Sequence, residues 1–155
     1  MPFRVTGLDG SQFEPLFALD DAALEARGMR RLTVDAKPGF PCRVSLEDAA
    51  PGEQVLLLAY EHQSAYSPFR ASGPIFVRET ARQMFNGVDQ LPPVFAGRLL
   101  SLRAYDAAGM MVDADVVEGR DAESVIARLF SRTDTAYLHA HYAKRGCFAC
   151  RIERR

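Results

Sequence analysis

The stretch AYLHAHYAKRGCFACRI, residues 136–152, holds two of the three histidines and two of the three cysteines of the chain. Within it, residues 137–142 and 148–152 each alternate between two kinds of side chain, and a short polar segment ending at Gly146 separates them. Alternation with a period of two on both sides of a glycine-containing turn is typical of a β-hairpin. The stretch therefore predicts a hairpin that carries both of its histidines on one face.

The four reactive side chains of this stretch are His139, His141, Cys147 and Cys150. Imidazole nitrogen and thiolate sulfur are the ligands that Zn²⁺ prefers, and two of each would complete a tetrahedral site. The sequence therefore indicates zinc as a candidate cofactor. The alternative is a polar sheet face that holds the histidines without a metal. Cys147 would then share that face as a candidate nucleophile, and Cys150 would be a small buried hydrophobic side chain.

A second hairpin is expected around a turn at residues 106–109. Its first strand carries Ser101 and Arg103 on one side, and its second strand carries Asp113 and Asp115 on one side. If this hairpin neighbours the C-terminal one, these side chains and the two histidines would share a polar face. Arg103, Asp113 and Asp115 are therefore candidate ligand-binding residues, because carboxylates beside imidazoles can bind a metal or perform acid–base chemistry. The alternative is an ordinary solvated sheet face.

Residues 61–73 (EHQSAYSPFRASG) form a long polar segment that is predicted to be a loop. Loops of this length in compact domains often carry function. Prolines on both sides of Arg70 stiffen the segment, which would hold Arg70 and Ser72 in place to bind an anionic group. The alternative for Arg70 is a solvated side chain without a ligand. His62 is interpreted as an ordinary pair with Glu61 at a strand end.

Short strands separated by turn signals make up most of the chain. A helix is expected over residues 122–131, with Asp121 as its N-cap, and shorter helical segments precede Gly28. Besides the C-terminal hairpin, strands are expected at residues 3–6, 30–36, 41–46, 55–60, 74–79, 99–105 and 111–117. This pattern predicts an α+β fold with a mostly antiparallel sheet of about seven to eight strands and roughly two or three helices.

The composition is that of an ordinary globular domain, with 155 residues, 48% of them hydrophobic and 25% charged. The length predicts one domain over residues 1–155. A net charge of −1 provides no basic field for nucleic acid, and the longest apolar run is too short to span a membrane. An odd number of cysteines and a polar N-terminal segment favour a cytoplasmic location.

Four runs along the chain resemble a known family: PGFPCRVSL (residues 38–46), SPFRASGPIFVRE (67–79), LSLRAYDAAGMMVDADVVEG (100–119) and AYLHAHYAKRGCFACRIER (136–154). The family is a bacterial one, catalogued as domain-of-unknown-function family 1203. The resemblance extends over nearly the whole chain and implies a bacterial single-domain protein. It implies no activity and no catalytic residues, because none is assigned to the family.

The residues themselves favour a protein that binds a small anionic or metal-linked ligand on its polar sheet face. The arginines would contact the anion, and the histidines and aspartates would hold a metal or orient the ligand. One alternative is a metal-dependent, acid–base or thiol enzyme that uses the same face, with Cys147 as nucleophile. Another is a structural or partner-binding domain without chemistry. Motifs typical of nucleotide hydrolases, serine hydrolases and zinc peptidases are absent from the sequence.

Overall fold

The computed structural model describes residues 2–155. Its strands are β1 (Phe3–Thr6), β2 (Arg30–Thr33), β3 (Gln54–Gln63), β4 (Ala71–Arg78), β5 (Asn86–Val88), β6 (Leu99–Tyr105), β7 (Met111–Glu118), β8 (Tyr137–Tyr142) and β9 (Phe148–Arg154). Its helices are α1 (Glu14–Phe17), α2 (Asp21–Ala26) and α3 (Ala122–Phe130), with short 3-10 helices η1 (Gly10–Gln12), η2 (Pro93–Phe95) and η3 (Gly119–Asp121). None of the helices formed by residues 2–155 combines the length and the apolar character that crossing a membrane requires.

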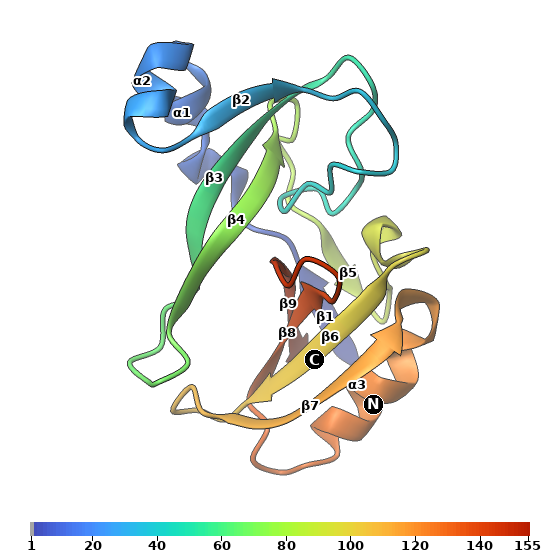
Figure 1. Ribbon diagram of the computed structural model, residues 1–155. Coiled ribbons are helices and arrows are strands. Elements are labelled where there is room, and N and C mark those ends of the chain that lie inside the picture. Colours follow the sequence, from blue (N-terminus) through green and yellow to red (C-terminus); the bar gives the residue numbers. More distant parts are fainter. Residues whose placement is uncertain (1) are drawn as a thin grey trace.

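The strands form two sheets, a six-stranded one in the order β5-β1-β9-β8-β6-β7 and a three-stranded one in the order β2-β3-β4 (Figure 1). Every pair of neighbouring strands is antiparallel. The predicted α+β class with mostly antiparallel sheet is therefore confirmed, and so are both predicted hairpins, β6–β7 and β8–β9.

Helix α3 covers one face of the six-stranded sheet (Figure 1). On that face Leu102 of β6 packs in one fully buried core with Ile126 and Leu129 of α3. Because side chains alternate along a strand, Ser101 and Arg103 point to the opposite face. The large sheet thus has an apolar face against α3 and a polar face on its other side.

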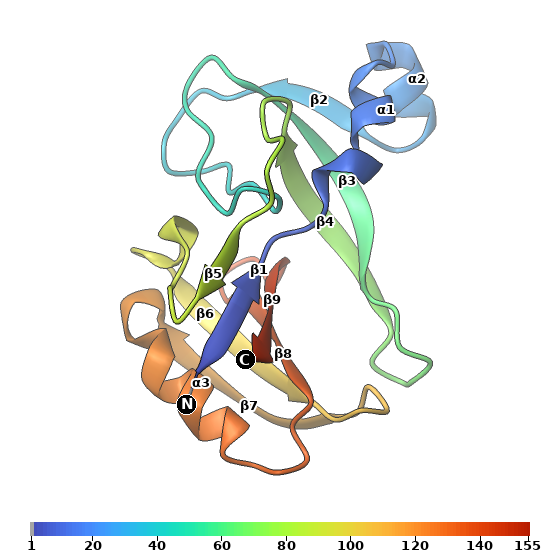
Figure 2. The same cartoon turned by 180° about the vertical axis from the view of Figure 1, so that it is seen from behind.

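Strands β3 and β4 form a long ribbon whose tip, residues 64–70, reaches the turn between β6 and β7 (Figures 1 and 2). There the hydroxyl of Ser67 donates a 2.8 Å hydrogen bond to the carbonyl of Gly109. Gly109 has a φ of 78°, and a Cβ built on it would overlap that of Ala65. Glycine at this position therefore permits both the turn and the close approach of the ribbon.

A second core lies between the small sheet and the N-terminal helices. Phe13 and Leu24 pack there against Leu56 of β3, and all three are buried. Helix α2 begins where the Asp20 carboxylate accepts a 2.8 Å hydrogen bond from the backbone N–H of Ala23, which satisfies one of the free donors of the first turn.

Residues 34–53 form an extended loop, so the strand predicted at 41–46 is wrong. Cys42 and Val44 are buried in the core of the small sheet, whereas Leu46 is buried in the core of the large one. Leu46 also has a φ of 52°, a left-handed conformation that a strand does not contain. The alternating pattern therefore reflects a loop that packs against two cores.

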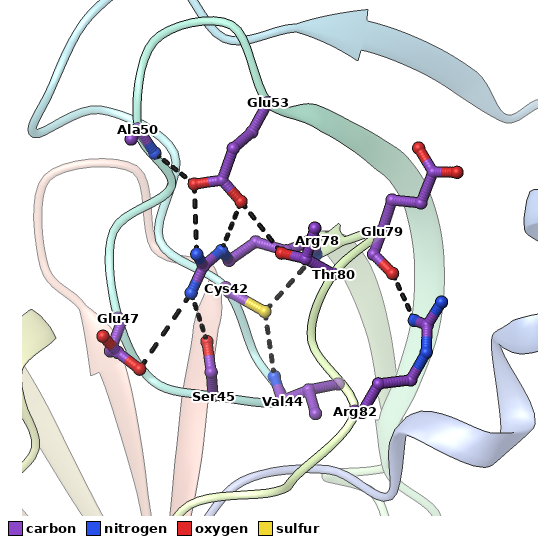
Figure 3. A network of polar contacts seen from close by, with 10 residues as sticks. All are labelled: Cys42, Val44, Ser45, Glu47, Ala50, Glu53, Arg78, Glu79, Thr80 and Arg82. Atoms are coloured by element: carbon purple, nitrogen blue, oxygen red, sulfur yellow. Dashed lines mark hydrogen bonds and ion pairs between the residues drawn. The ribbon is translucent and has the colours of Figure 1, made fainter.

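Figure 3 shows the polar network that ties this loop to β4. The guanidinium of Arg78 donates to both carboxylate oxygens of Glu53, at 2.8 and 3.1 Å. Burial acts to raise the pKa of Glu53, but the bonds from Arg78, from the Ala50 N–H and from the Thr80 hydroxyl together hold that pKa below its usual value. The sulfur of Cys42 accepts weak bonds from the backbone N–H groups of Val44 and Arg78, both at 3.4 Å. Cys42 is thus part of the loop's structure.

Two predicted boundaries also need correction. Strand β3 continues through Gln63 past an irregularity after Tyr60, and β4 begins at Ala71, so the loop predicted at 61–73 is only seven residues, 64–70. Asp121 lies at the end of η3 and makes no side-chain capping bond to α3. Asp121 is thus the N-cap residue of α3 as predicted, but it follows a 3-10 turn and caps the helix without a side-chain bond.

Candidate ligand site

The polar face of the large sheet carries Ser101 and Arg103 together with His139 and His141, as the alternation predicts. In the pairing of β6 with β8, Ser101 lies opposite His141 and Arg103 lies opposite His139, and directly opposed residues share a face. His62 of the β3–β4 ribbon lies against the two histidines, which are only 2% and 1% exposed, whereas Ser101 and Arg103 are partly exposed. The polar face is therefore an internal layer between the two sheets.

The third histidine, His62, joins this layer from β3. Its ring centroid lies 5.0 Å from that of His141 and 6.3 Å from that of His139. Its ring also stacks on Phe148, at 5.3 Å with an interplanar angle of 12°. The interpretation of His62 as a strand-end pair with Glu61 is wrong, because β3 runs through both residues. If the strand predicted at residues 55–60 had been extended by three residues, its alternation would have placed His62 on the same side as Leu58 and Tyr60.

Burial sets the charge state of the histidine layer. It lowers the pKa of His139 to about 3 and that of His141 to about 4, and the positive charge of Arg103 acts in the same direction. Burial also lowers the pKa of His62. His141 Nδ1 lies 2.9 Å from the carbonyl of Gly146, so that nitrogen carries the hydrogen. The buried histidines are therefore neutral near pH 7.

Each ring retains one buried nitrogen without a hydrogen-bond partner among residues 2–155: Nδ1 of His62, Nδ1 of His139 and Nε2 of His141. Leaving such a group unpaired costs about 1–3 kcal/mol. Within the same residues, no group of three or more His, Cys, Asp or Glu side chains is arranged to hold a metal ion. The layer is thus a set of neutral, incompletely bonded imidazoles.

The four predicted zinc ligands do not come together. Cys150 lies opposite Ala140 and is 1% exposed in the core on the α3 side. The pairing of β8 with β9 is shifted between Ala140 and His141, which places Phe148 opposite His141. Cys150 therefore points away from the histidine face, and burial raises its pKa far above the usual value.

Asp113 and Asp115 also lie apart from the histidines. In the pairing of β6 with β7, Asp115 is opposite Leu102 and Asp113 is opposite Ala104, both on the α3 side of the sheet. There the carboxylates pair with Arg128 of α3, at 2.6 Å from Asp115 and 3.5 Å from Asp113. The predicted polar face that combined these aspartates with the histidines is therefore wrong.

The predicted anion contacts Arg70 and Ser72 are exposed residues on the ribbon. Arg70 forms a 3.3 Å ion pair with Glu61 of the adjacent strand. Arg103 lies on the histidine face, where its Nε donates to Ser101 at 3.2 Å. These three residues do not form one site.

A basic pocket of about 570 Å³ lies where the 34–53 loop meets the β8–β9 turn and the segment after η2. Its lining includes the cationic side chains Arg43, Arg98, Lys144 and Arg145, the aromatic side chains Phe40, Phe76 and Tyr142, and Cys147. Lys144 and Arg145 are exposed residues of the turn, whereas Arg43 is only 1% exposed. The sequence distributes these residues over more than a hundred positions, which is why no local motif identified the pocket.

Arg43 is the most unusual residue of this pocket. Its Nε donates to the carbonyl of Phe148 at 2.8 Å, one Nη donates to the carbonyl of Pro41 at 2.6 Å, and the other donates to Cys147 Sγ at 3.1 Å. It forms no ion pair with any carboxylate of residues 2–155. Buried guanidinium groups are normally paired with an anion. Arg43 therefore carries a buried positive charge without a counter-charge of its own.

Arg98, in contrast, is neutralised by Asp48 through two bonds of 2.7 and 2.8 Å. The guanidinium groups of Arg43 and Arg98 lie 5.0 and 5.3 Å from the ring centroid of Tyr142, within the range of cation–π attraction. The Tyr142 hydroxyl is buried and has no hydrogen-bond partner among residues 2–155. Burial raises the pKa of Tyr142 well above its usual value, so the hydroxyl keeps its hydrogen and is a free donor.

Fold and pocket together define an α+β protein of two antiparallel sheets with a basic, aromatic-walled pocket between the large sheet and the 34–53 loop. A family model described as "Protein of unknown function (DUF1203)" matches residues 39–154. The chain belongs to this family, as the resemblance of its sequence runs predicts.

One curated relative is similar to this chain. It is GTP cyclohydrolase FolE2 of Cereibacter sphaeroides (strain ATCC 17025 / ATH 2.4.3), which is 28% identical over 115 residues. The match covers 68% of this chain and 31% of the relative, so the chain spans only about a third of the relative's length. No solved structure matches the chain significantly.

Proposed function

We propose that this protein binds a small organic anion with a planar ring, and that the basic pocket is its site. The observation that carries the proposal is Arg43, a buried guanidinium without a carboxylate partner among residues 2–155. An anion in the pocket would supply the missing counter-charge. Three of the five N–H groups of Arg43 are used by the bonds described above. Two remain for a phosphate or carboxylate.

The charge of the pocket supports the same conclusion. Lys144 and Arg145, like Arg43, have no ion-pair partner among the described residues. Three uncompensated cations at one pocket repel one another, and an anion would relieve that repulsion. Polar groups at the pocket would thus fix the charged part of the ligand.

The walls of the pocket support a planar ligand. Phe40 and Phe76 lie with their ring centroids 5.0 Å apart, and both line the pocket. Its volume of about 570 Å³ falls within the range of small-molecule sites. The relative named above is a GTP cyclohydrolase, and GTP combines a planar ring with several anionic groups. A nucleotide-like anion is therefore the ligand class we propose.

Calorimetric titration with GTP and with uncharged guanosine tests this proposal. We expect GTP to bind at about 0.1 M salt and guanosine to bind at least about tenfold more weakly, because guanosine lacks the charge. The double variant Lys144→Gln/Arg145→Gln should weaken GTP binding by roughly five- to tenfold, since each exposed cation contributes up to about 1 kcal/mol. Both residues are exposed, so the fold should be unaffected.

The matched control is Arg27→Gln, which removes an exposed cation at the end of α2 that is not part of the pocket lining. It should bind GTP as the unmodified protein does. Equal affinity for GTP and guanosine, or the same loss in the control as in the double variant, would contradict the proposal.

A further inference from the structure

We infer that Cys147 is a nucleophile of the basic pocket and attacks an electrophilic carbon of the anion bound there. The inference rests on the proposed anion binding and adds a reaction to it. Cys147 lines the pocket and is partly exposed, whereas Cys42 and Cys150 are 0% and 1% exposed. Of the three thiols, therefore, only Cys147 can meet a ligand.

The position of Cys147 is fixed by the β8–β9 turn. Its carbonyl accepts a 2.9 Å bond from the N–H of Tyr142, and the N–H of Gly146 donates to the Tyr142 carbonyl at 2.7 Å. Gly146 adopts a φ of 80°, which a glycine accommodates without strain. The sulfur is thus held at a defined point of the pocket, as a nucleophile must be.

The surroundings of the sulfur suit nucleophilic attack. Arg43 donates to Sγ at 3.1 Å, and the guanidinium of Arg98 also lies within about 5.3 Å of the Tyr142 ring centroid. The thiolate is the attacking form of cysteine, and a cationic donor against the sulfur is a recurring feature of reactive cysteines. Arg43 would thereby have two tasks, to bind the ligand's anionic group and to hold the sulfur in place through its 3.1 Å bond.

An independent observation also points to a ligand beside Cys147. The hydroxyl of Tyr142, a residue that is 6% exposed and lines the same pocket, has no hydrogen-bond partner among residues 2–155. A buried hydroxyl without a partner is costly, and a ligand atom would complete it. The protonated hydroxyl is a donor that can serve an atom on which charge develops.

The reaction balances without an oxidant or reductant. Cys147 releases its proton to solvent, and Sγ forms a bond to the carbon of a C=O or C=N group of the ligand. The π electron pair of that group moves onto its oxygen or nitrogen, to which the Tyr142 hydroxyl would donate a hydrogen bond. That atom then takes a proton from solvent through the pocket.

Two alkylating reagents of matched size test the inference, because iodoacetate is an anion and iodoacetamide is neutral. In both cases Sγ displaces iodide from carbon, and peptide mass spectrometry identifies the modified cysteine. We expect Cys147 to react with iodoacetamide at least about tenfold faster than glutathione does at the same pH, while Cys42 and Cys150 stay unmodified. We also expect the ratio of iodoacetate rate to iodoacetamide rate to be at least about tenfold higher for Cys147 than for glutathione.

Charge variants separate this inference from the proposed function. Lys144→Gln/Arg145→Gln should lower the iodoacetate rate at Cys147 several-fold and leave the iodoacetamide rate nearly unchanged, and Arg27→Gln should change neither. If GTP binds as proposed but Cys147 reacts no faster than glutathione, the nucleophile inference is overturned and anion binding stands. Cys147 could also react rapidly with iodoacetamide while it shows no preference for iodoacetate and GTP does not bind. That result would overturn the proposed anion binding, and the attack of Cys147 on a bound anion would be overturned with it.

Discussion

Acidification should destabilise this protein through its buried histidines, well before its carboxylates titrate. In the folded protein the pKa of His139 is about 3 and that of His141 is about 4, against a usual value of 6.5 that applies to the unfolded chain. Between those values the unfolded state binds protons that the folded state does not. The contribution of the neutral histidines to stability is therefore complete above pH 6.5 and is lost progressively as the pH falls below it.

The size of this loss of stability follows from the pH range that separates the usual histidine pKa from the lowered values. Each pH unit below 6.5 costs about 1.4 kcal/mol for each histidine that stays neutral in the folded state. At a pH of about 4.5, two units below the usual value, the two histidines together should lower the free energy of unfolding by about 5 kcal/mol. That is a large share of the roughly 5–15 kcal/mol that stabilises a typical domain.

No acidic group compensates protonation in this layer. The charged groups that act on the two rings are Arg103, Arg151 and Arg43, and each of them opposes a positive charge there. The Gly146 carbonyl favours the protonated form of His141, but burial outweighs it. The acidic groups with lowered pKa values, such as Asp48 and Glu53, keep their stabilising charge until the pH falls below about 4. The change in the free energy of unfolding between pH 6.5 and about 4.5 is therefore due to the histidines.

Urea denaturation at a series of pH values measures this effect. The double variant His139→Gln/His141→Asn replaces both imidazoles with amides that do not titrate. It should start from a lower stability at neutral pH and then lose much less stability than the unmodified protein between pH 6.5 and about 4.5, because only His62 remains to titrate in the layer. If the variant loses as much stability between pH 6.5 and about 4.5 as the unmodified protein does, the histidines are not the cause and the argument is refuted.

Two further predictions concern the contacts that position the pocket and the ribbon. Gly109→Ala should lower the free energy of unfolding by about 2–4 kcal/mol, because the new methyl group meets Ala65 and the backbone is left-handed there. Gly97 is the control, since it has a φ of 74° but open space around it. Gly97→Ala should lower the free energy of unfolding by only about 1–2 kcal/mol in the same urea titration. Asp48→Asn should lower the free energy of unfolding by about 2–3 kcal/mol, because it leaves the largely buried guanidinium of Arg98 without its counter-charge. If the thermal midpoint is unchanged, water replaces the carboxylate and this prediction is wrong.

The elements that the sequence predicted best are those whose pattern depends on neighbours along the chain. The β8–β9 hairpin and the apolar side of α3 follow from local alternation and helical spacing. The same alternation cannot say which face of one strand matches which face of the next. The pairing of β6 with β7 decides that Asp115 lies opposite Leu102, and no period within either strand contains this information.

The pocket was not predictable for a different reason. Arg43 lies in a segment whose alternation imitates a strand, and its contacts, Phe148 and Cys147, are more than a hundred residues away. Its burial without an acidic partner is visible only in three dimensions. The sequence identified Cys147 as a reactive candidate, but it assigned the thiol to the histidines instead of to a buried arginine.

Arg43 connects the two polar regions, and this connection explains why the pocket should gain stability from its ligand. Its Nε holds the carbonyl of Phe148, whose ring stacks on His62, while its other end reaches Cys147 in the pocket. Any charge that the histidine layer acquires is therefore added to a cation that already lacks a counter-ion. An anion bound at Arg43 would reduce that repulsion in the folded state alone, so ligand binding and resistance to acid should increase together.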